Sequence, residues 1–420
     1  MFRHSRLSNG LVVATAAMPH RVSTSLGLWI GVGGRHEPAA WNGAAHFIEH
    51  MLFKGTARRS PREISQAVEG VGGSLNAFTS EENTCFFSKA LHDRLPDLLD
   101  VLMDMFLHSR FAPRDIDLER DVIKDEVAMY LDEPQHHVQE LINETLWPDH
   151  PLGRPLTGTL KTLNRLRREH LLEFMRQNYV AANTVIAVAG RLRHEDVLQM
   201  VGRYASRLPQ GPPAPFTPVV STQDRPRVKL FTKDGAQTQI VLGVRTCSRH
   251  DERRFALRLL NAMLGENMSS RLFQELREDR GLAYSIQSAL SFFHDVGTLD
   301  ISVGLDTENL PQAVGLILRE LRRLADKPPP RAELHRARDY VLGQFDLSLE
   351  NTENQMNWLG ENWLGFGKIF APADIKRRLA EVKAADISAV ARDFFRPDRM
   401  NLALVSPLKS ARKLERLLGP

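Results

Sequence analysis

Cysteine is scarce in this sequence. Its 420 residues include only two, Cys85 and Cys247, which lie far apart and form no C-x-x-C pattern. Their number and spacing exclude a disulfide framework and a metal site built from thiolates. We therefore expect the protein to work in a reducing compartment, of which the bacterial cytoplasm is an example.

Long apolar runs are also absent. No stretch approaches the roughly 20 apolar residues that a membrane-spanning helix needs. The first residues, MFRHSRLSNGLVVATA, lack the charged start and continuous apolar core of a signal peptide. They are typical of two strands joined by a turn at Ser8-Asn9-Gly10. We expect a cytoplasmic protein with no membrane contact, whose fold begins near residue 1.

Positive charge is in only slight excess. The chain has 55 Lys and Arg residues against 51 Asp and Glu, which gives a net charge of +4. The basic residues are spread along the chain, as in RRLADK and RPDR, whereas nucleic-acid binders concentrate them and interleave aromatic residues. A solvated surface explains the excess, and we expect no nucleic-acid partner.

The length of the chain and a linker near its middle indicate two domains. A chain of 420 residues is too long for one ordinary core. Residues 205–227, ASRLPQGPPAPFTPVVSTQDRPR, crowd proline, glycine and polar residues together, which is typical of a loop or linker. We predict an N-terminal domain over 1–208, a proline-rich linker over 209–227 and a C-terminal domain over 228–420.

The two halves resemble each other. TSLGLWIGVGGRHE begins at Thr24 and TQIVLGVRTCSRHDE at Thr238, an offset of 238 − 24 = 214. Each half also ends in a helix, a turn and an apolar strand, REHLLEFMRQNYVAANTVIAVAG in the first and ADISAVARDFFRPDRMNLALVSP in the second. Chance similarity of short apolar patterns is the alternative, but duplication is the simpler account. Alternating runs such as SLNAFTSEENTCFFSKAL favour antiparallel pairing. We predict an α+β fold of two tandem homologous α/β-sandwich domains, each with helices against one face of a mainly antiparallel sheet.

The most specific motif is HFIEH at residues 46–50. The apolar residues around it predict a mostly buried helix, on which positions i, i+3 and i+4 share a face. His46, Glu49 and His50 therefore point the same way. Two imidazoles one turn apart can hold one Zn²⁺, and a carboxylate on the same face can take a proton from water. A structural helix with ordinary hydrogen bonds is the alternative.

The repeat separates these two interpretations. The offset of 214 takes 46–50 to 260–264, which reads LNAML. The second copy of the helix thus carries leucine and methionine and none of the three polar groups. Because the fold does not need these groups, we interpret HFIEH as part of a metal site.

A catalytic zinc needs a third protein ligand and an open position for water. The acid-rich stretch PRDIDLERDVIKDEVAMYLDEP predicts a helix that offers Glu119 and Glu126, which are seven residues apart and so lie on one face. The spacing alone does not choose between them. A purely structural zinc is the alternative, but such sites often use cysteine, and no cysteine lies near the motif.

These motifs resemble the inverted-zincin metallopeptidases of family M16, also called the pitrilysin family, which includes insulin-degrading enzyme and the mitochondrial processing peptidases. In that family H-x-x-E-H is followed by a pattern like E-R-x-V-I-x-x-E, here ERDVIKDE at 119–126. The resemblance covers essentially the whole chain and points to the short two-domain type. It implies one Zn²⁺ per chain held by His46, His50 and Glu126, with Glu49 as the general base and Glu119 orienting His50.

Two further segments resemble functional parts of the family. GGSLNAFTSEENT resembles the substrate-binding edge strand, so a peptide would bind as an added strand with Asn76 and Ala77 beside the scissile bond. An ordinary strand is the alternative. SSRLFQELREDRGLAYSI resembles a signature whose Arg277 and Tyr284 would donate hydrogen bonds to the substrate carbonyl.

The resemblance also implies a partner. Large family members carry four such domains in one chain and enclose a chamber, whereas this chain has two. A homodimer is the economical way to complete the chamber, and Arg277 and Tyr284 would then serve the zinc of the other subunit. The expected function is a zinc-dependent endopeptidase that hydrolyses peptides or unfolded, presequence-like segments. The alternative is a non-catalytic or heteromer-dependent subunit that supports a partner peptidase.

Overall fold

The computed structural model describes residues 2–220 and 223–419. Residues 1, 221, 222 and 420, which fall in the predicted domains and linker, lie outside the described residues. The chain divides into two compact units. Unit 1 comprises Met1–Ala128, Arg154–Thr217 and Asp346–Ala371, and unit 2 comprises Met129–Gly153, Pro218–Phe345 and Pro372–Pro420. Both units thus take segments from both halves of the sequence, which the continuous ranges 1–208 and 228–420 do not anticipate.

The sheet of unit 1 contains, within the described residues, six strands in the order β1-β2-β6-β3-β5-β4. β2 and β6 are parallel, and the other neighbours are antiparallel. The predicted N-terminal hairpin is confirmed, because β1 pairs with β2 across the turn at Ser8-Asn9-Gly10. The strands are β1 (Phe2–Arg6), β2 (Val12–Ala17), β3 (Ser23–Ile30), β4 (Ser74–Thr79), β5 (Thr84–Leu91) and β6 (Thr184–Gly190).

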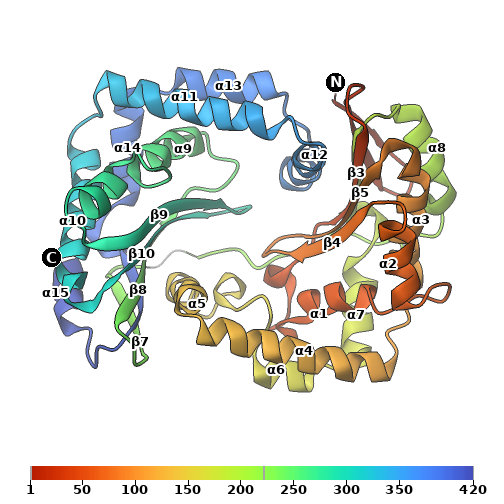
Figure 1. The fold of residues 1–420 in the computed structure, drawn as a ribbon, viewed down its shortest axis with the longest axis horizontal. Helices are drawn as coiled ribbons and strands as arrows, with labels where there is room; N and C mark the ends of the chain where they lie inside the picture. Colours follow the sequence, from red (N-terminus) through yellow and green to blue (C-terminus); the bar gives the residue numbers. More distant parts are fainter. Residues whose placement is uncertain (1, 221–222, 420) are drawn as a thin grey trace. The chain divides into compact units, whose positions relative to one another are not determined.

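Helices cover both faces of this sheet. One face packs against α1, α3 and α7 around a core that includes Leu26, Phe47, Leu102 and Phe174. The other face packs against α12, a helix from the second half of the sequence (Figure 1). The helices with residues in this unit are α1 (Ala44–Leu52), α2 (Pro61–Glu69), α3 (Leu95–His108), α4 (Pro113–Asp132), α6 (Leu160–Arg165), α7 (Arg168–Asn178), α8 (His194–Ala205), α11 (Arg331–Ser348) and α12 (Thr352–Phe366).

The contact with α12 explains why the central strands of unit 1 are apolar on both faces. Every residue of β6 is buried. Trp29 of β3 is fully buried, and its indole Nε1 donates to Met356 Sδ at 3.1 Å. Gly360 lies so close to this ring that a Cβ atom would come within 2.4 Å of it. The expectation of helices against one sheet face is therefore wrong, since continuously apolar strands need cover on both sides.

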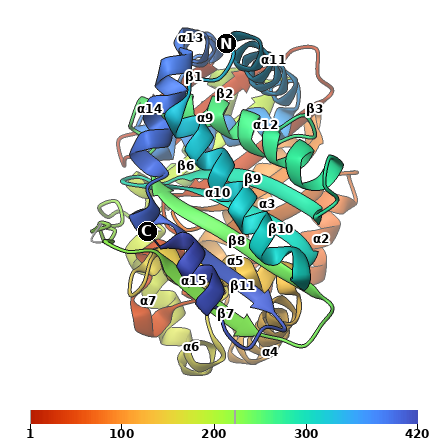
Figure 2. The ribbon, with the colours of Figure 1, turned by 90° about the vertical axis from the view of Figure 1, so that its left-hand side faces the viewer.

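The sheet of unit 2 contains five strands among the described residues, in the order β7-β11-β8-β10-β9. β7 and β11 are parallel, and the other neighbours are antiparallel. The helices α9, α10 and α14 lie over one face (Figure 2), and α5 packs against β8 and β11. The elements are β7 (Arg227–Thr232), β8 (Gln237–Thr246), β9 (Ala283–Phe292), β10 (Gly297–Asp306), β11 (Asn401–Ser406), α5 (Pro134–Leu146), α9 (Arg253–Leu264), α10 (Leu310–Asp326), α13 (Pro372–Glu381), α14 (Ala384–Phe394) and α15 (Arg412–Leu418). Most of α11 and the last residues of α4 also belong to this unit.

The two sheets share one topology, which confirms the fold class predicted from the repeat. In order and direction, β2, β6, β3, β5 and β4 of unit 1 correspond to β7, β11, β8, β10 and β9 of unit 2. The similar segments at Thr24 and Thr238 form the equivalent strands β3 and β8. Each unit also takes one helix from the other half of the sequence, α12 in unit 1 and α5 in unit 2.

The longest helices are too polar for a bilayer. α4 and α11 carry charged residues along their whole length. Across residues 2–220 and 223–419, no helix combines the length and the apolar character that crossing a membrane requires.

Because α12 covers one face of the sheet of unit 1, weakening this contact is expected to destabilise the protein. Leu359 of α12 is fully buried in this contact, whereas Leu347 of α11 is 63% exposed. Leu359→Ala is expected to lower the free energy of unfolding by about 2–5 kcal/mol, because it leaves a cavity. Leu347→Ala, the matched control, is expected to change it by less than about 0.5 kcal/mol. Urea unfolding followed by tryptophan fluorescence measures both, and equal effects would contradict this account of the core.

Candidate metal centre

The helix predicted at HFIEH is α1. Its polar residues His46, Glu49 and His50 share one face at spacings of three and four residues. The rest of the helix faces the core of unit 1, so packing fixes the orientation of the polar face. The buried residues are Ala44, Ala45, Phe47, Ile48, Met51 and Leu52.

A side chain from outside the helix caps the N-terminus of α1. Glu37 Oε2 accepts from the Gly43 N–H at 2.8 Å, and Glu37 Oε1 accepts from the Ala45 N–H at 2.7 Å. Asn42 Nδ2 donates to the same carboxylate at 3.1 Å. Gly43 has φ of 95°, and a Cβ atom there would lie 2.7 Å from the carbonyl oxygen of Thr157. Glu37 thus supplies the acceptors that a helix N-terminus lacks, and Gly43 lets the chain enter the helix in a confined space.

Three potential ligands converge between α1 and α4. His46 Nε2 and His50 Nε2 each lie 3.7 Å from Glu126 Oε2. One ligand atom from each of the three residues lies within 4.8 Å of the others. Burial, with a smaller contribution from His50, lowers the pKa of His46 to about 4. His46 is therefore neutral at pH 7, the form in which imidazole binds a metal.

Glu119, the second acid predicted on α4, contacts His50 on the other side of its ring. Glu119 Oε2 lies 3.1 Å from His50 Nδ1, and Glu119 Oε1 accepts from Lys54 Nζ at 2.6 Å. A proton on Nδ1 directed at Glu119 leaves Nε2 of His50 free to bind a metal. Lys54 balances the charge of this carboxylate, whose side chain is only 7% exposed.

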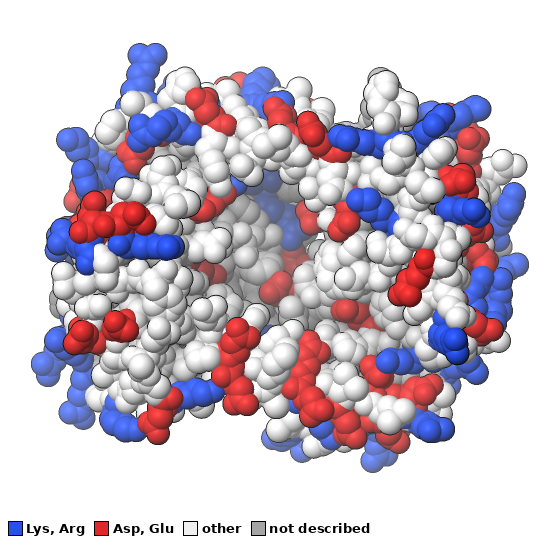
Figure 3. Space-filling model, in the orientation of Figure 1, with Lys and Arg blue, Asp and Glu red and all other residues white. Residues whose placement is uncertain are grey.

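Burial distinguishes Glu119 and Glu126 from other acids of α4. Red side chains gather over α4 in the space-filling view (Figure 3). The side chains of Asp117 and Asp121 are 79% and 76% exposed, whereas that of Glu126 is 22% exposed. The structure therefore gives the two glutamates different places: Glu126 beside both histidines and Glu119 against His50 alone.

Glu49 lies on the same face of α1 and is held by the sheet. Thr79 Oγ1 donates to Glu49 Oε2 at 2.6 Å. Burial raises the pKa of Glu49 above its usual value, while the bond from Thr79 acts in the opposite direction. A carboxyl group with a raised pKa holds a transferred proton more readily than an ordinary carboxylate does.

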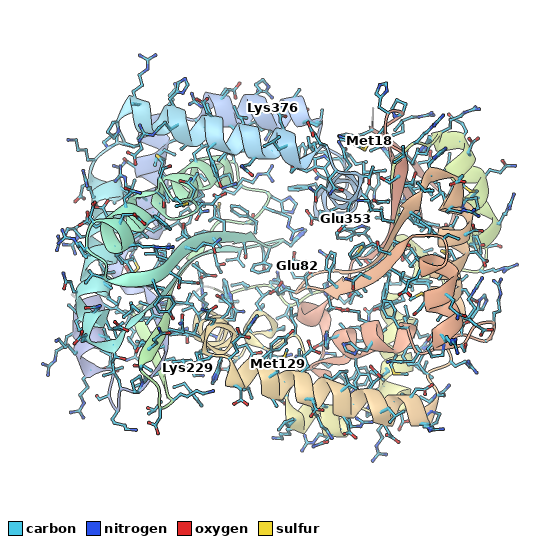
Figure 4. All side chains as sticks on the ribbon, viewed as in Figure 1. Met18, Glu82, Met129, Lys229, Glu353 and Lys376 are labelled. Atoms are coloured by element: carbon cyan, nitrogen blue, oxygen red, sulfur yellow. The ribbon has the colours of Figure 1, made fainter. Side chains whose placement is uncertain are left out.

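The predicted substrate-binding stretch forms β4, an edge strand that pairs in the described structure with β5 alone. Asn76 and Ala77 lie in its middle. The Ala77 N–H donates to Asn76 Oδ1 at 2.8 Å. In the turn after β4, Glu82 (Figure 4) pairs at 2.7 Å with the fully buried guanidinium of Arg35. The hairpin is thus fixed at its tip, and the other edge of β4 pairs with no strand in the described structure.

Arg277 and Tyr284 belong to unit 2. Arg277 lies on the short helical segment Phe273–Glu278, and its guanidinium lies 4.9 Å from the centre of the Phe273 ring. Tyr284 lies on β9, the edge strand of its sheet, and its hydroxyl accepts from Gln239 Nε2. The Tyr284 side chain is 40% exposed. Both residues are accessible on unit 2, and their role toward a substrate stays a prediction.

The ligand set fits zinc. With zinc–ligand bonds of about 2.0–2.1 Å, neighbouring atoms of a tetrahedral site lie about 3.4 Å apart. The separation of 3.7 Å between each imidazole Nε2 and Glu126 Oε2 is close to this value. Two nitrogens and one carboxylate oxygen also leave one position open, as hydrolytic zinc sites require. In the part of the chain that the structure describes, His46, His50 and Glu126 are the one such cluster.

Three contacts of this site, from Glu37, Lys54 and Thr79, are not apparent from the sequence. Lys54 lies two residues after the end of α1 and Thr79 lies in the predicted edge strand, but neither residue type is unusual there. Only the fold brings Lys54 to Glu119 and Thr79 to Glu49. For Glu37, an acid shortly before a helix N-terminus was the available signal.

Comparison with known proteins finds relatives along the whole chain. Residues 12–160 match the sequence model of Insulinase (Peptidase family M16), and residues 165–341 match that of the Peptidase M16 inactive domain. A Mycobacterium tuberculosis protein described as an uncharacterized zinc protease is 37% identical over 419 residues, 99% of this chain and 95% of the relative. A Bacillus subtilis protein with the same description is 35% identical over 410 residues, 97% and 98% of the two chains.

Solved structures share the fold. The crystal structure of a protease from Helicobacter pylori matches with a TM-score of 0.91 and 22% identity, over 97% of this chain and 99% of that chain. A Pseudomonas fluorescens structure, named a peptidase M16 inactive domain, matches with a TM-score of 0.90 and 20% identity at the same coverage. At these identities the likeness concerns the fold alone.

The contact between Glu119 and His50 predicts a contribution to metal affinity. Glu119→Gln is expected to weaken zinc binding about 10- to 100-fold, because the neutral amide orients the imidazole less firmly than a carboxylate. Asp121→Asn removes an acid from the exposed side of the same helix and is expected to leave the affinity unchanged. Competition with a fluorescent chelator measures both dissociation constants. Equal affinities of the wild type and Glu119→Gln would show that Glu119 has no part in the site.

Proposed function

Because the chain belongs to peptidase family M16, the insulinase family, we propose that it is a zinc-dependent endopeptidase of peptides or unfolded, presequence-like segments. The convergence of His46, His50 and Glu126 carries this proposal. The relatives described as zinc proteases support it, since they match almost the whole chain.

Different side chains of unit 1 have different roles in the proposed reaction. His46, His50 and Glu126 would hold the ion. Bound Zn²⁺ acts as a Lewis acid that lowers the pKa of water and polarises a peptide carbonyl. Glu49 takes a proton from the attacking water and later delivers it to the nitrogen of the leaving amine. Glu119 holds His50 in the orientation that binding requires.

The open edge of β4 supports an extended peptide as the substrate. Main-chain hydrogen bonds to such an edge bind a peptide largely without regard to its sequence. The Ala77 N–H donates to the amide oxygen of Asn76, and a peptide carbonyl of the substrate would replace that oxygen. An unfolded segment can supply the extended main chain that this pairing needs, whereas a folded protein cannot.

A homodimer would complete the site. The chain has two units, and its resemblance to larger family members, which enclose a chamber, suggests that two copies are needed for the same enclosure. In such a dimer, Arg277 and Tyr284 of one subunit would donate hydrogen bonds to the substrate carbonyl at the other subunit's zinc. Charge that develops on that oxygen in the transition state would be stabilised by both donors.

Glu49→Gln separates catalysis from metal binding. The amide keeps the size of the side chain but cannot take a proton, so kcat is expected to fall by about 10²- to 10⁴-fold, with zinc content unchanged. Glu69→Gln, at the exposed end of α2, is the matched control and is expected to retain full activity. Cleavage of a quenched fluorescent peptide library, beside metal analysis of each protein, provides both measurements.

The same assay tests the alternative of a heteromer-dependent or non-catalytic subunit. A wild-type protein that binds zinc but cleaves no peptide of the library would contradict a self-sufficient peptidase. Recovery of cleavage on adding a second chain of the family would then assign it to a heteromer. Activity that is equal in wild type and Glu49→Gln would contradict the role of Glu49.

Hydrogen bonds from Arg277 and Tyr284 of one subunit to the substrate at the other subunit predict that two inactive variants restore activity in a mixed dimer. A mixed dimer is made from one Glu49→Gln subunit and one subunit with Arg277→Ala and Tyr284→Phe, and is purified through two different tags. It contains one complete site, so about half of the wild-type activity is expected, although each homodimer is nearly inactive. An inactive mixed dimer, or a monomer fully active at nanomolar dilution, would contradict the dimeric site.

A further inference from the structure

We infer that Thr79 is a positioning residue, which holds the carboxylate of Glu49 at a fixed place relative to the peptide-binding edge of β4. This inference rests on the proposed peptidase function. It adds a residue that touches neither the metal ligands nor, through its side chain, the peptide.

The bond between Thr79 and Glu49 is short and specific. Thr79 Oγ1 lies 2.6 Å from Glu49 Oε2, the length of a strong hydrogen bond from a hydroxyl to a carboxylate. Glu49 is partly buried on α1, and no second side-chain bond to its carboxylate is described. One oxygen of the carboxylate is thus held, and the other is left to exchange a proton.

Thr79 itself is held firmly. It pairs with Thr84 at the end of the β4–β5 ladder. The next residue, Ser80, donates its N–H to the carbonyl of Asn83 at 2.8 Å and closes the turn. Thr84 is anchored in turn, because its hydroxyl donates to the carbonyl of Val32 at 2.9 Å. The main chain that carries the Thr79 hydroxyl is therefore fixed in position.

The register also places the main chain of Thr79 at the open edge. Hydrogen-bonded and non-bonded pairs alternate along an antiparallel ladder. Because Ser80 and Asn83 form a bonded pair, the Thr79–Thr84 and Ala77–Phe86 pairs are non-bonded. The N–H and C=O groups of Thr79 and Ala77 therefore point away from β5. The bond from Ala77 N–H to Asn76 Oδ1 agrees with this direction.

Thr79 thus connects the binding of the peptide with the transfer of the proton. The main chain of Thr79 lies on the edge where a peptide would pair, and its side chain holds the proposed base. A peptide aligned by β4 would meet a carboxylate whose distance from that strand is set by one hydrogen bond. Small errors in such a distance are costly, since about 1 Å of misplacement can lower a rate 100-fold.

Thr79→Val, Thr79→Ser and Thr184→Val test this inference in the full-length, zinc-loaded protein. Thr79→Val keeps the branched shape favoured in strands but removes the hydroxyl. Thr79→Ser keeps the hydroxyl. Thr184→Val is the matched control, because it removes a hydroxyl bond to the carbonyl of Val180 from β6, a strand of the same sheet that does not pair with β4. Steady-state cleavage of a quenched fluorescent peptide, zinc content and the unfolding temperature are measured for each variant.

The expected pattern is specific to positioning. Thr79→Val lowers kcat by about 10- to 100-fold with KM changed less than about twofold, while zinc content is unchanged. Thr79→Ser recovers most of the lost kcat. Thr184→Val lowers the unfolding temperature and leaves kcat unchanged. In the Glu49→Gln background, where the peptide is bound but not cleaved, adding Thr79→Val leaves the peptide dissociation constant unchanged.

Three results would overturn the inference: wild-type kcat in Thr79→Val, no recovery in Thr79→Ser, or a loss of peptide affinity that equals the loss of kcat. The last would assign Thr79 to the shape of the strand. These results differ from a failure of the proposed function, in which the wild type itself cleaves no peptide or Glu49→Gln cleaves as well as the wild type does.

Discussion

The candidate site depends on how one short helix is held. α1 has nine residues, too few for a helix to be stable by itself. Its apolar face is buried, and the carboxylate of Glu37 bonds the N–H groups of Gly43 and Ala45 at its N-terminus. Packing sets the rotation of α1, and the cap sets where it begins. The backbone positions of His46, Glu49 and His50 are therefore fixed, and only their side-chain rotamers remain to be set.

Each polar side chain of α1 then has one rotamer favoured by a contact from another element. Glu119 of α4 faces the Nδ1 atom of His50, and Lys54 neutralises Glu119. Thr79 of β4 holds Glu49. His46 and His50 both face Glu126. The site is assembled from a helix, a second helix and a strand edge, all packed around the core of unit 1, so its geometry is inherited from that core.

Much of this arrangement could be predicted from the sequence. The repeat predicted the shared topology of the two sheets, and the spacing of HFIEH predicted the common face of its three polar residues. The third ligand could not be chosen by spacing, because Glu119 and Glu126 lie on one face of α4 and differ in what they meet. The contacts of Glu37, Lys54 and Thr79 join segments by tertiary packing, which leaves no periodic trace in the sequence.

The exchange of helices between the two halves could not be predicted from the sequence for a related reason. A repeat compares each half with the other and does not show which sheet a helix covers. The fully buried strand β6 was the available sign, since an apolar run without alternation indicates cover on both faces. The origin of that cover, in α12 of the second half, follows only from the structure.

This exchange means that the sheet of unit 1 and the helix that covers its second face are synthesised at different times on the ribosome. The last strand of the unit 1 sheet ends at Gly190, but the helix that covers its second face ends at Phe366. Trp29 and the apolar face around it therefore stay uncovered while most of unit 2 is being synthesised. The nascent chain must keep this face from aggregating until α12 arrives, as slow-maturing domains generally must. Metal-site residues of unit 1 are thus all translated long before the unit that holds them is complete.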